Sequence, residues 1–121
     1  MTAMTTEVVL PFQVRRLAFA YEERPGSFKE RPVVVGHVSE GEAVVLVVKV
    51  TGHGPRPEFP GEVRLLDWEE AGLAKPSVAR CSKVALVDLG LLEAAPLYGR
   101  LSARDVAAVE RGLREAGWAR G

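Results

Sequence analysis

Three residues at the borders of apolar segments carry the side chains best suited to chemistry: Arg31, Thr51 and His53. Arg31 precedes a proline and a run of valines, while Thr51 and His53 follow the apolar segment 43–50. A guanidinium stays charged at any working pH, a threonine hydroxyl can donate a hydrogen bond, and a histidine can exchange protons near neutral pH. Gly52, beside Thr51, would let the backbone approach a ligand closely. We therefore expect a catalytic role for these three residues.

Each of them also has a plain structural interpretation. A proline is tolerated at the first position of a strand, and Arg31 would then be a solvated cation beside it. Threonine is common in strands whatever their function. His37, at the end of the valine run, is the second candidate for proton transfer. Neither histidine has an acidic or cysteine partner at ligand spacing, so we expect no metal site and no cofactor.

Length and charge restrict the class of protein. The 121 residues predict a single domain over residues 14–121, preceded by a partly flexible N-terminal segment, 1–13. The formal net charge is zero, which gives no global argument for a nucleic-acid partner, although residues 75–83 hold three cations and no anion. The longest apolar run, 44–48, is far shorter than the about 18 residues of a membrane span, and the N-terminus lacks a signal pattern. We therefore expect no membrane contact.

The chain has a single cysteine, Cys81, which cannot form an internal disulfide. Cysteine usage of this kind is typical of cytoplasmic proteins, and we expect that location. Because Cys81 lies just ahead of an apolar run, we expect a small buried residue rather than a nucleophile.

Strand patterns dominate the chain up to residue 90. Apolar alternation or valine-rich composition predicts strands over 14–21, 31–38, 43–51 and 62–66, with a fifth strand within 77–90. The tight turn 39–42 joins two of them into a hairpin. Residues 52–61 hold three glycines and three prolines, which predicts an irregular loop. Short, evenly spaced strands of this kind favour a small antiparallel barrel or sandwich.

Two helices are predicted. Residues 67–73 resemble a short helix that begins at Asp67 and ends at Gly72. A longer C-terminal helix is predicted after Ser102, its N-cap, with Asp105 three residues later in an arrangement close to a capping box. Its apolar stripe comprises Val106, Val109, Leu113 and Ala116, and Gly117 ends it. The predicted fold is therefore mainly β, with a short helical insertion and a C-terminal helix that covers part of the sheet.

Four segments resemble the MazF/PemK family of toxin endoribonucleases. They are KERPVVV (29–35), VKVTGH (48–53), LLDWEEAGLAKPSVAR (65–80) and GRLSARDVAAV (99–109), in the family's order and spacing. The resemblance covers roughly residues 14–117. It implies an SH3-like β-barrel that forms a homodimer, with RNA in a groove at the subunit interface. It also implies a cognate antitoxin whose disordered tail occupies the same groove.

The resemblance also implies the chemistry. Members cleave single-stranded RNA without a metal, with the 2′-OH attacking the adjacent phosphorus. In the family an arginine before the proline and a Thr or Ser at a strand end belong to the site, which gives Arg31 and Thr51 these places. Arg31 would stabilise the charge of the phosphorane, since a guanidinium forks onto phosphate oxygens. The chain would then be the toxin of a type II toxin–antitoxin pair.

Other residues are expected to contact the RNA. An acidic residue is common in the family's loop before the Arg-Pro strand, so Glu22 or Glu23 could be a general base, although a solvated turn charge is the favoured interpretation of both. Phe28 and Phe59 lie on predicted loops and could stack on bases. Trp68 is expected in the core instead, and Ser77 could simply order its turn. The expected substrate contacts are Glu23, Phe28, Lys29, Arg56, Ser77 and Arg80.

Two other functions remain open. The chain could be a catalytically inactive member of the family that binds an antitoxin-like peptide or RNA, because no residue stands out as a general base. It could also be a gyrase-poisoning toxin of the related barrel, which acts by protein–protein contact and has no nuclease site. The presence of Arg31 and Thr51 argues mildly against the gyrase-poisoning alternative.

Overall fold

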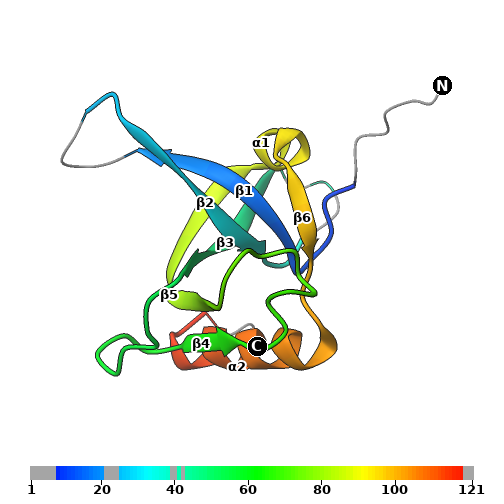
Figure 1. Ribbon diagram of the computed structural model, residues 1–121. Helices are drawn as coiled ribbons and strands as arrows, with labels where there is room; N and C mark the ends of the chain where they lie inside the picture. The colour runs from blue at the N-terminus through cyan, green and yellow to red at the C-terminus, as the bar shows by residue number, and fades with distance from the viewer. Residues whose placement is uncertain (1–7, 21–24, 39–40, 42, 119–121) are drawn as a thin grey trace.

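The chain forms one curled antiparallel sheet with two helices (Figure 1). The computed structural model describes residues 8–20, 25–38, 41 and 43–118. In chain order the elements are β1 (Gln13–Ala20), β2 (Phe28–Val35), β3 (Val44–Thr51), β4 (Glu62–Leu65), β5 (Ser77–Asp88), α1 (Leu89–Ala94), β6 (Leu97–Arg100) and α2 (Ala103–Glu115). The strands pair in the order β4-β5-β3-β2-β1-β6. The predicted mainly β fold, a small antiparallel barrel with a C-terminal helix, is confirmed.

Most predicted strands form close to their predicted bounds. β1, β3 and β4 begin or end within one residue of the prediction, whereas β2 begins three residues earlier, at Phe28, and ends at Val35. β2 and β3 pair antiparallel, as the hairpin prediction requires. Most of the predicted turn 39–42 lies outside the described residues.

The predicted helix at 67–73 is wrong. A hydrogen bond from Ala71 N to Asp67 O closes one helical turn, but Gly72 then adopts a positive φ of 86°. Asp67 cannot cap a helix here because its carboxylate binds Ser102 and Arg104 instead. The short helix of the fold is α1, which follows β5 directly, and β6 comes after it; neither was predicted.

Each face of the sheet buries its own apolar cluster, because alternate residues of a strand point to opposite faces. The first cluster packs beneath α2; its strand residues include Val14, Val34, Val48, Val50 and Leu65, and Val109 comes from the helix. We call this side the α2 face. The second cluster lies on the other side, beneath α1; it includes Leu17, Val33, Val35, Val45, Val47 and Leu92. Valine-rich strands therefore supply both faces.

A network at the start of α2 fixes this helix to the segment after β4. The backbone N–H groups of Leu66 and Asp67 donate to the Asp105 carboxylate at 2.9 and 2.8 Å. The Asp67 carboxylate accepts from the hydroxyl of Ser102, at 2.6 Å, and from the guanidinium of Arg104. These bonds lower the pKa of Asp67 to about 2, with Arg104 as the largest cause and Ser102 as the next. We call Asp67, Ser102, Arg104 and Asp105 the clamp.

The predicted ends of α2 are confirmed, with one difference. Ser102 is the N-cap, and its hydroxyl accepts from the Asp105 N–H. The Asp105 side chain does not complete a capping box, since it reaches across to the chain after β4. Gly117 follows the helix with a φ of 90°, as expected for a C-terminal stop.

A buried arginine joins α1 to the sheet. Arg15 of β1 is 1% exposed and donates to the carbonyls of Leu92 and Ala95 at 2.9 and 3.0 Å. It therefore fixes the helix over one end of the sheet and leaves the other end of the same face without a helix.

Within the described residues, no helix has the length and apolar character needed to cross a membrane.

Candidate functional site

Arg31 and Thr51 lie on the same face of the sheet, on neighbouring strands. β2 and β3 pair with Val33 opposite Lys49. The pairing runs from Val35 opposite Val47 to Val33 opposite Lys49, and Arg31 and Thr51 each lie two residues beyond this last pair. Both are half-buried, at the end of the sheet that α1 does not cover. The two residues on which the sequence interpretation depended therefore share one face of the sheet, just beyond the end of the β2–β3 pairing.

The strand register extends this face across the sheet. Leu17 pairs with Arg31 across β1 and β2, while Thr51, Val78 and Arg64 form a row across β3, β5 and β4. The next row contains Val33, Lys49, Arg80 and Glu62. The cations on this end of the face are Lys29, Arg31, Lys49, Arg64 and Arg80, and Glu62 is the carboxylate among them. We call this end of the face, with its five cations, the basic face.

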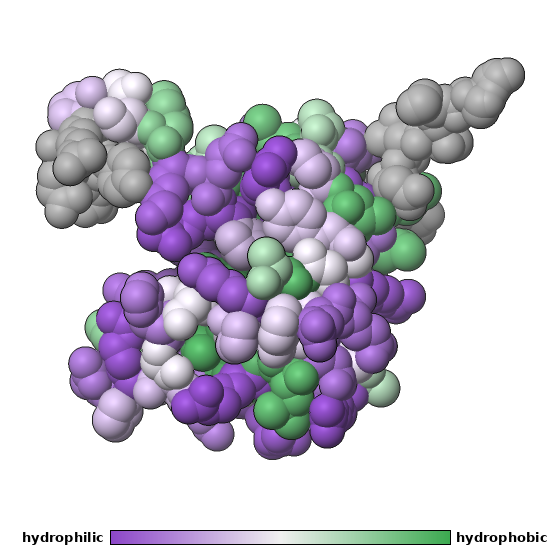
Figure 2. Space-filling model, viewed as in Figure 1, coloured by the Kyte–Doolittle hydropathy of each residue, from purple (hydrophilic) through white to green (hydrophobic). Residues whose placement is uncertain are grey.

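The surface around the β1–β2 hairpin fits this description. Figure 2 shows hydrophilic side chains on both sides of the indentation between the hairpin and the lower part of the molecule. On the other face of the hairpin, Arg16 forms an ion pair with Glu30 at 3.3 Å. The hairpin therefore directs a paired arginine to one side and Arg31 to the other.

Lys49 links the basic face to an aromatic ring. Its ammonium lies 4.7 Å from the ring centroid of Phe19 on β1, two strands away. The side chain must therefore run across β2, where Arg31 lies on the same face. Two cations held close together on one face favour an anionic ligand between them.

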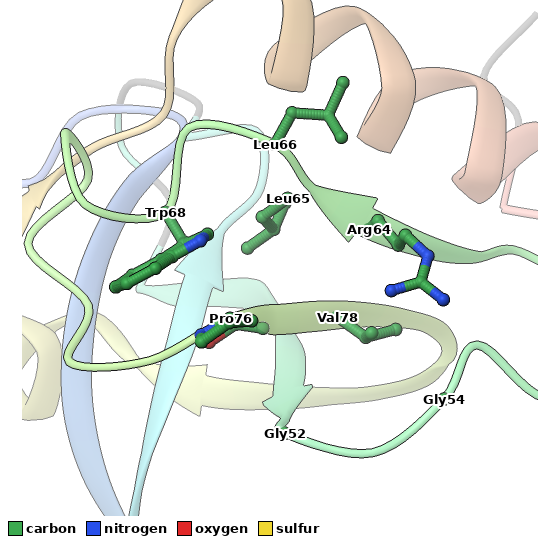
Figure 3. A pocket seen from close by; sticks show the side chains of 9 residues that line it. Gly52, Gly54, Arg64, Leu65, Leu66, Trp68, Pro76 and Val78 are labelled. Atoms are coloured by element: carbon green, nitrogen blue, oxygen red, sulfur yellow. The ribbon is translucent and has the colours of Figure 1, made fainter.

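A pocket of about 180 Å³ lies at the end of β3, next to Thr51. Figure 3 shows Arg64 and Trp68 on either side of Leu65, Pro76 and Val78, with Gly52 and Gly54 at the loop side. A Cβ at Gly52 would come within 3.1 Å of the Lys75 ammonium, so this backbone lies against a further cation. Trp68 packs against the core beneath α2, as expected.

The two histidines lie in different places. The His53 backbone N–H donates to the Thr51 hydroxyl oxygen at 3.3 Å, which leaves the hydroxyl hydrogen able to donate elsewhere. His53 itself is exposed. His37 lies beyond the opposite end of β2 from Arg31, near Phe12 and Trp118. The structure therefore keeps His53 beside Thr51 and separates His37 from it.

The expected substrate contacts fall into three groups. Phe28 and Lys29 are exposed near the tip of the hairpin, where Phe28 is 66% exposed. Arg56 and Arg80 lie together around the ring of Phe59. Ser77 lines the pocket, but its hydroxyl donates to the Lys75 carbonyl at 2.8 Å and so orders that turn. Glu22 and Glu23 lie outside the described residues.

Two further observations concern chemistry. Cys81 is buried beneath α2, and this burial, together with a smaller effect of Glu115, raises the pKa of its thiol to about 12. The prediction that it is a buried residue is confirmed. Over the residues that the structure describes, no three His, Cys, Asp or Glu side chains gather as a metal site would need.

Sequence reasoning missed Lys49, Arg64 and Glu62. Lys49 had a usable signal, because a lysine two residues before Thr51 in a strand shares its face. Arg64 and Glu62 had none, since their place on this face depends on the pairing of β4 with β5, which composition does not indicate.

Comparison with known proteins agrees with this fold. The family of PemK-like, MazF-like toxins of type II toxin–antitoxin systems matches residues 8–116. No curated protein matches the chain. An endoribonuclease from a mycobacterial species has a TM-score of 0.67 at 14% identity, covering 93% of this chain and 94% of its own. The MazE–MazF complex of Deinococcus radiodurans gives 0.67 at 17% identity, with coverages of 88% and 94%.

A third structure, the Mycobacterium tuberculosis toxin MazF-mt6, gives a TM-score of 0.58 at 22% identity, with coverages of 88% and 94%. At these identities the structural likeness shows a common fold. The family match shows in addition that the chain belongs to this family, because the match extends from the residues before β1 to just beyond α2. The protein is therefore a member of the PemK-like, MazF-like toxin family of type II toxin–antitoxin systems.

Proposed function

We propose that this toxin is a metal-independent endoribonuclease that cleaves single-stranded RNA with some sequence preference. The observation that carries the proposal is that Arg31 and Thr51 share the open end of one sheet face, on neighbouring strands that pair as far as Val33 and Lys49. The surrounding cations support it, because a single strand of RNA presents one negative charge per nucleotide. Mycobacterial and Deinococcus proteins of the same fold are named as an endoribonuclease and as MazF.

The reaction needs no group beyond side chains and the RNA itself. The 2′-oxygen loses its proton and forms a bond to the adjacent phosphorus, and the bond from phosphorus to the 5′-oxygen breaks. The 5′-oxygen takes up a proton, so the products are a 2′,3′-cyclic phosphate and a 5′-hydroxyl. Arg31 would hold the non-bridging oxygens with two N–H donors, and the Thr51 hydroxyl would donate to one of them.

Proton transfer requires a side chain that can accept the 2′-proton. His53 is the candidate within the described residues, because its backbone is bonded to Thr51 and an imidazole can both accept and donate a proton. Glu23, which precedes β2 by five residues, is the candidate outside them. We propose that one of these side chains accepts the 2′-proton.

Partners follow from the proposed activity. A cognate antitoxin with an acidic segment would compete with RNA for the basic face, since both carry negative charge. The complex of MazE and MazF in a protein of the same fold supports such a pair. We further propose a homodimer that acts in the cytoplasm, where its RNA substrates are. Light scattering on the purified protein tests the dimer.

The decisive experiment is cleavage of a long RNA by purified protein, with and without EDTA. We expect discrete fragments that persist in EDTA and carry 5′-hydroxyl ends. Arg31→Ala should abolish them, whereas Arg16→Ala should not, because Arg16 lies on the same hairpin but on its other face. A 2′-deoxy substitution at the scissile nucleotide should also prevent cleavage.

Other outcomes separate the alternatives. RNA that stays intact but is bound by the wild-type protein would favour a binding module without nuclease activity. Intact RNA with inhibited supercoiling by gyrase would favour the gyrase-poisoning alternative. Cleavage that stops in EDTA would contradict the proposed mechanism.

A further inference from the structure

The loop between β3 and β4 places one aromatic ring among three cations. The charged groups of Arg56, Arg80 and Lys83 lie 5.4, 4.7 and 5.3 Å from the ring centroid of Phe59. We call these four residues the Phe59 cluster. Each contact with the ring is favourable, but like charges at this spacing repel one another.

An irregularity in β5 creates the cluster. Val84 pairs with Val48 and Arg80 with Lys49, so residues 81–83 have no partners on β3. In a regular strand, residues three apart point to opposite faces. The bulge removes this alternation, as bulges do when they redirect a side chain, and Lys83 reaches the same ring as Arg80.

A buried carboxylate holds the cluster in place. The Glu62 side chain is 1% exposed. It accepts from Arg80 Nε at 2.6 Å and from the Arg56 backbone N–H at 2.8 Å. Burial alone would raise the pKa of Glu62, but these donors lower it. Because Glu62 takes only the Nε of Arg80, the fork of terminal nitrogens is left to bind a ligand.

The cluster continues the basic face. Arg80 pairs with Lys49, which lies two residues before Thr51 on the same face. The adjoining hollow is lined by Arg56, Phe59 and Glu62, with Glu115 of α2 as a second carboxylate at its edge. Three cations against two carboxylates leave the cluster positive.

We propose that the Phe59 cluster binds a backbone phosphate of a nucleotide flanking the scissile step. This inference rests on the proposed function, since it assumes that RNA lies across Arg31 and Thr51. Arg80 would supply two donors to phosphate oxygens and Lys83 a point charge, while Phe59 and Glu62 hold these groups in position. The cluster would thus add affinity for longer RNA and contribute little to the chemical step.

Binding of a fully 2′-deoxy oligonucleotide tests the proposal without cleavage. Fluorescence anisotropy would follow a labelled single strand from about 50 to about 200 mM salt, where each phosphate contact contributes about 0.7 to the slope of log K against log salt. We expect Lys83→Ala to weaken binding severalfold and to reduce the slope by about 0.7. The double variant Glu62→Gln/Arg80→Gln should do the same without leaving a charge buried alone. Arg100→Ala, which removes an exposed cation of β6 at the other edge of the sheet, is the matched control.

Cleavage kinetics provide a second readout. On a long RNA Lys83→Ala should raise KM and leave kcat near wild type, and on a short RNA that spans only the scissile step it should behave as wild type. Unchanged slopes and unchanged length dependence would overturn the proposal. Weaker binding of a decaglutamate peptide, with RNA binding unaffected, would also overturn it and assign the cluster to an acidic protein partner. Failure of the wild type to bind or cleave any RNA would instead overturn the proposed function itself.

Discussion

On the α2 face of the sheet the carboxylates of the clamp are bonded within the protein, whereas the basic face holds five cations around the carboxylate of Glu62, which binds Arg80. Asp67 is bonded to both Ser102 and Arg104, and Asp105 accepts two backbone N–H groups. Satisfied in this way, the clamp residues have little capacity left for a ligand. The basic face has the opposite character, because its unneutralised charge needs an anion from outside.

This difference between the two faces assigns a structural role to the most distinctive motif, the stretch 65–80. The stretch 65–80 and the segment 99–109 resemble the family most specifically, yet Asp67, Ser102 and Asp105 join these two segments to each other. Their side chains build the fold. The candidate chemistry lies on the other face, in residues whose motifs are short. Apart from Arg80, which ends the stretch 65–80 but lies on the basic face, the strongest resemblance and the candidate catalytic residues therefore lie on different faces of this molecule.

The largest effect is expected on the basic face. Thr51→Val removes one donor to the developing charge but keeps the shape of the side chain. Loss of a single donor of this kind costs about 10²–10³-fold in rate. Thr51→Ser, which keeps the hydroxyl, should stay close to wild type. Single-turnover cleavage of RNA measures both, and equal rates for the two variants would show that the hydroxyl takes no part.

A substitution in the clamp should instead lower the stability of the fold and leave cleavage unchanged. Asp105→Ala leaves the N–H groups of Leu66 and Asp67 without their acceptor in a site that is 1% exposed. Hydrogen bonds to charged groups contribute about 1.5–3 kcal/mol, and we expect a loss of stability in that range. Urea denaturation measures the loss, with exposed Asp88→Ala as the control. Cleavage per folded molecule should be unchanged; a stable but inactive variant would contradict the division between the two faces.

The clamp also predicts a dependence of stability on acid. The pKa of Asp67 is lowered from 3.8 to about 2, so its ionised form is favoured in the folded state. Its contribution is fully present above the unfolded pKa and is lost as the pH falls from about 3.8 toward about 2. Asp67→Asn should flatten this part of the pH–stability curve, measured by thermal unfolding. A curve that keeps the wild-type slope would show that other carboxylates dominate it.

The sequence predicted what local patterns determine. Valine-rich runs gave the strands, and Ser102 with Gly117 gave the ends of α2. Residues 67–73 carry helix-like signals, but a tertiary contact from Ser102 and Arg104 takes the capping carboxylate of Asp67. The local helix propensity of this segment is overridden by a hydrogen bond from Ser102, 35 residues away, and no local sequence pattern contains that information.

In the candidate site, too, the sequence predicted what depends on local patterns and not what depends on tertiary packing. Arg31 and Thr51 border the apolar runs of strands that the sequence shows as neighbours, so their place on one face could be expected, but Arg31 lies within β2 and not at its start. The Phe59 cluster could not be, because it depends on a bulge in β5 and on a loop that folds back onto that strand. Strand irregularities of this kind are set by the packing of the whole sheet.

The smallest effect on cleavage is expected at Cys81, which lies on the α2 face. Burial, with a smaller contribution from Glu115, raises the pKa of its thiol to about 12, so almost no thiolate is present at neutral pH. Because the thiolate is the nucleophile, iodoacetamide should react slowly with the folded protein and rapidly once it is denatured. Cys81→Ala should cleave RNA at the wild-type rate. Rapid alkylation of the folded protein with loss of cleavage would place chemistry on both faces and remove the contrast between them.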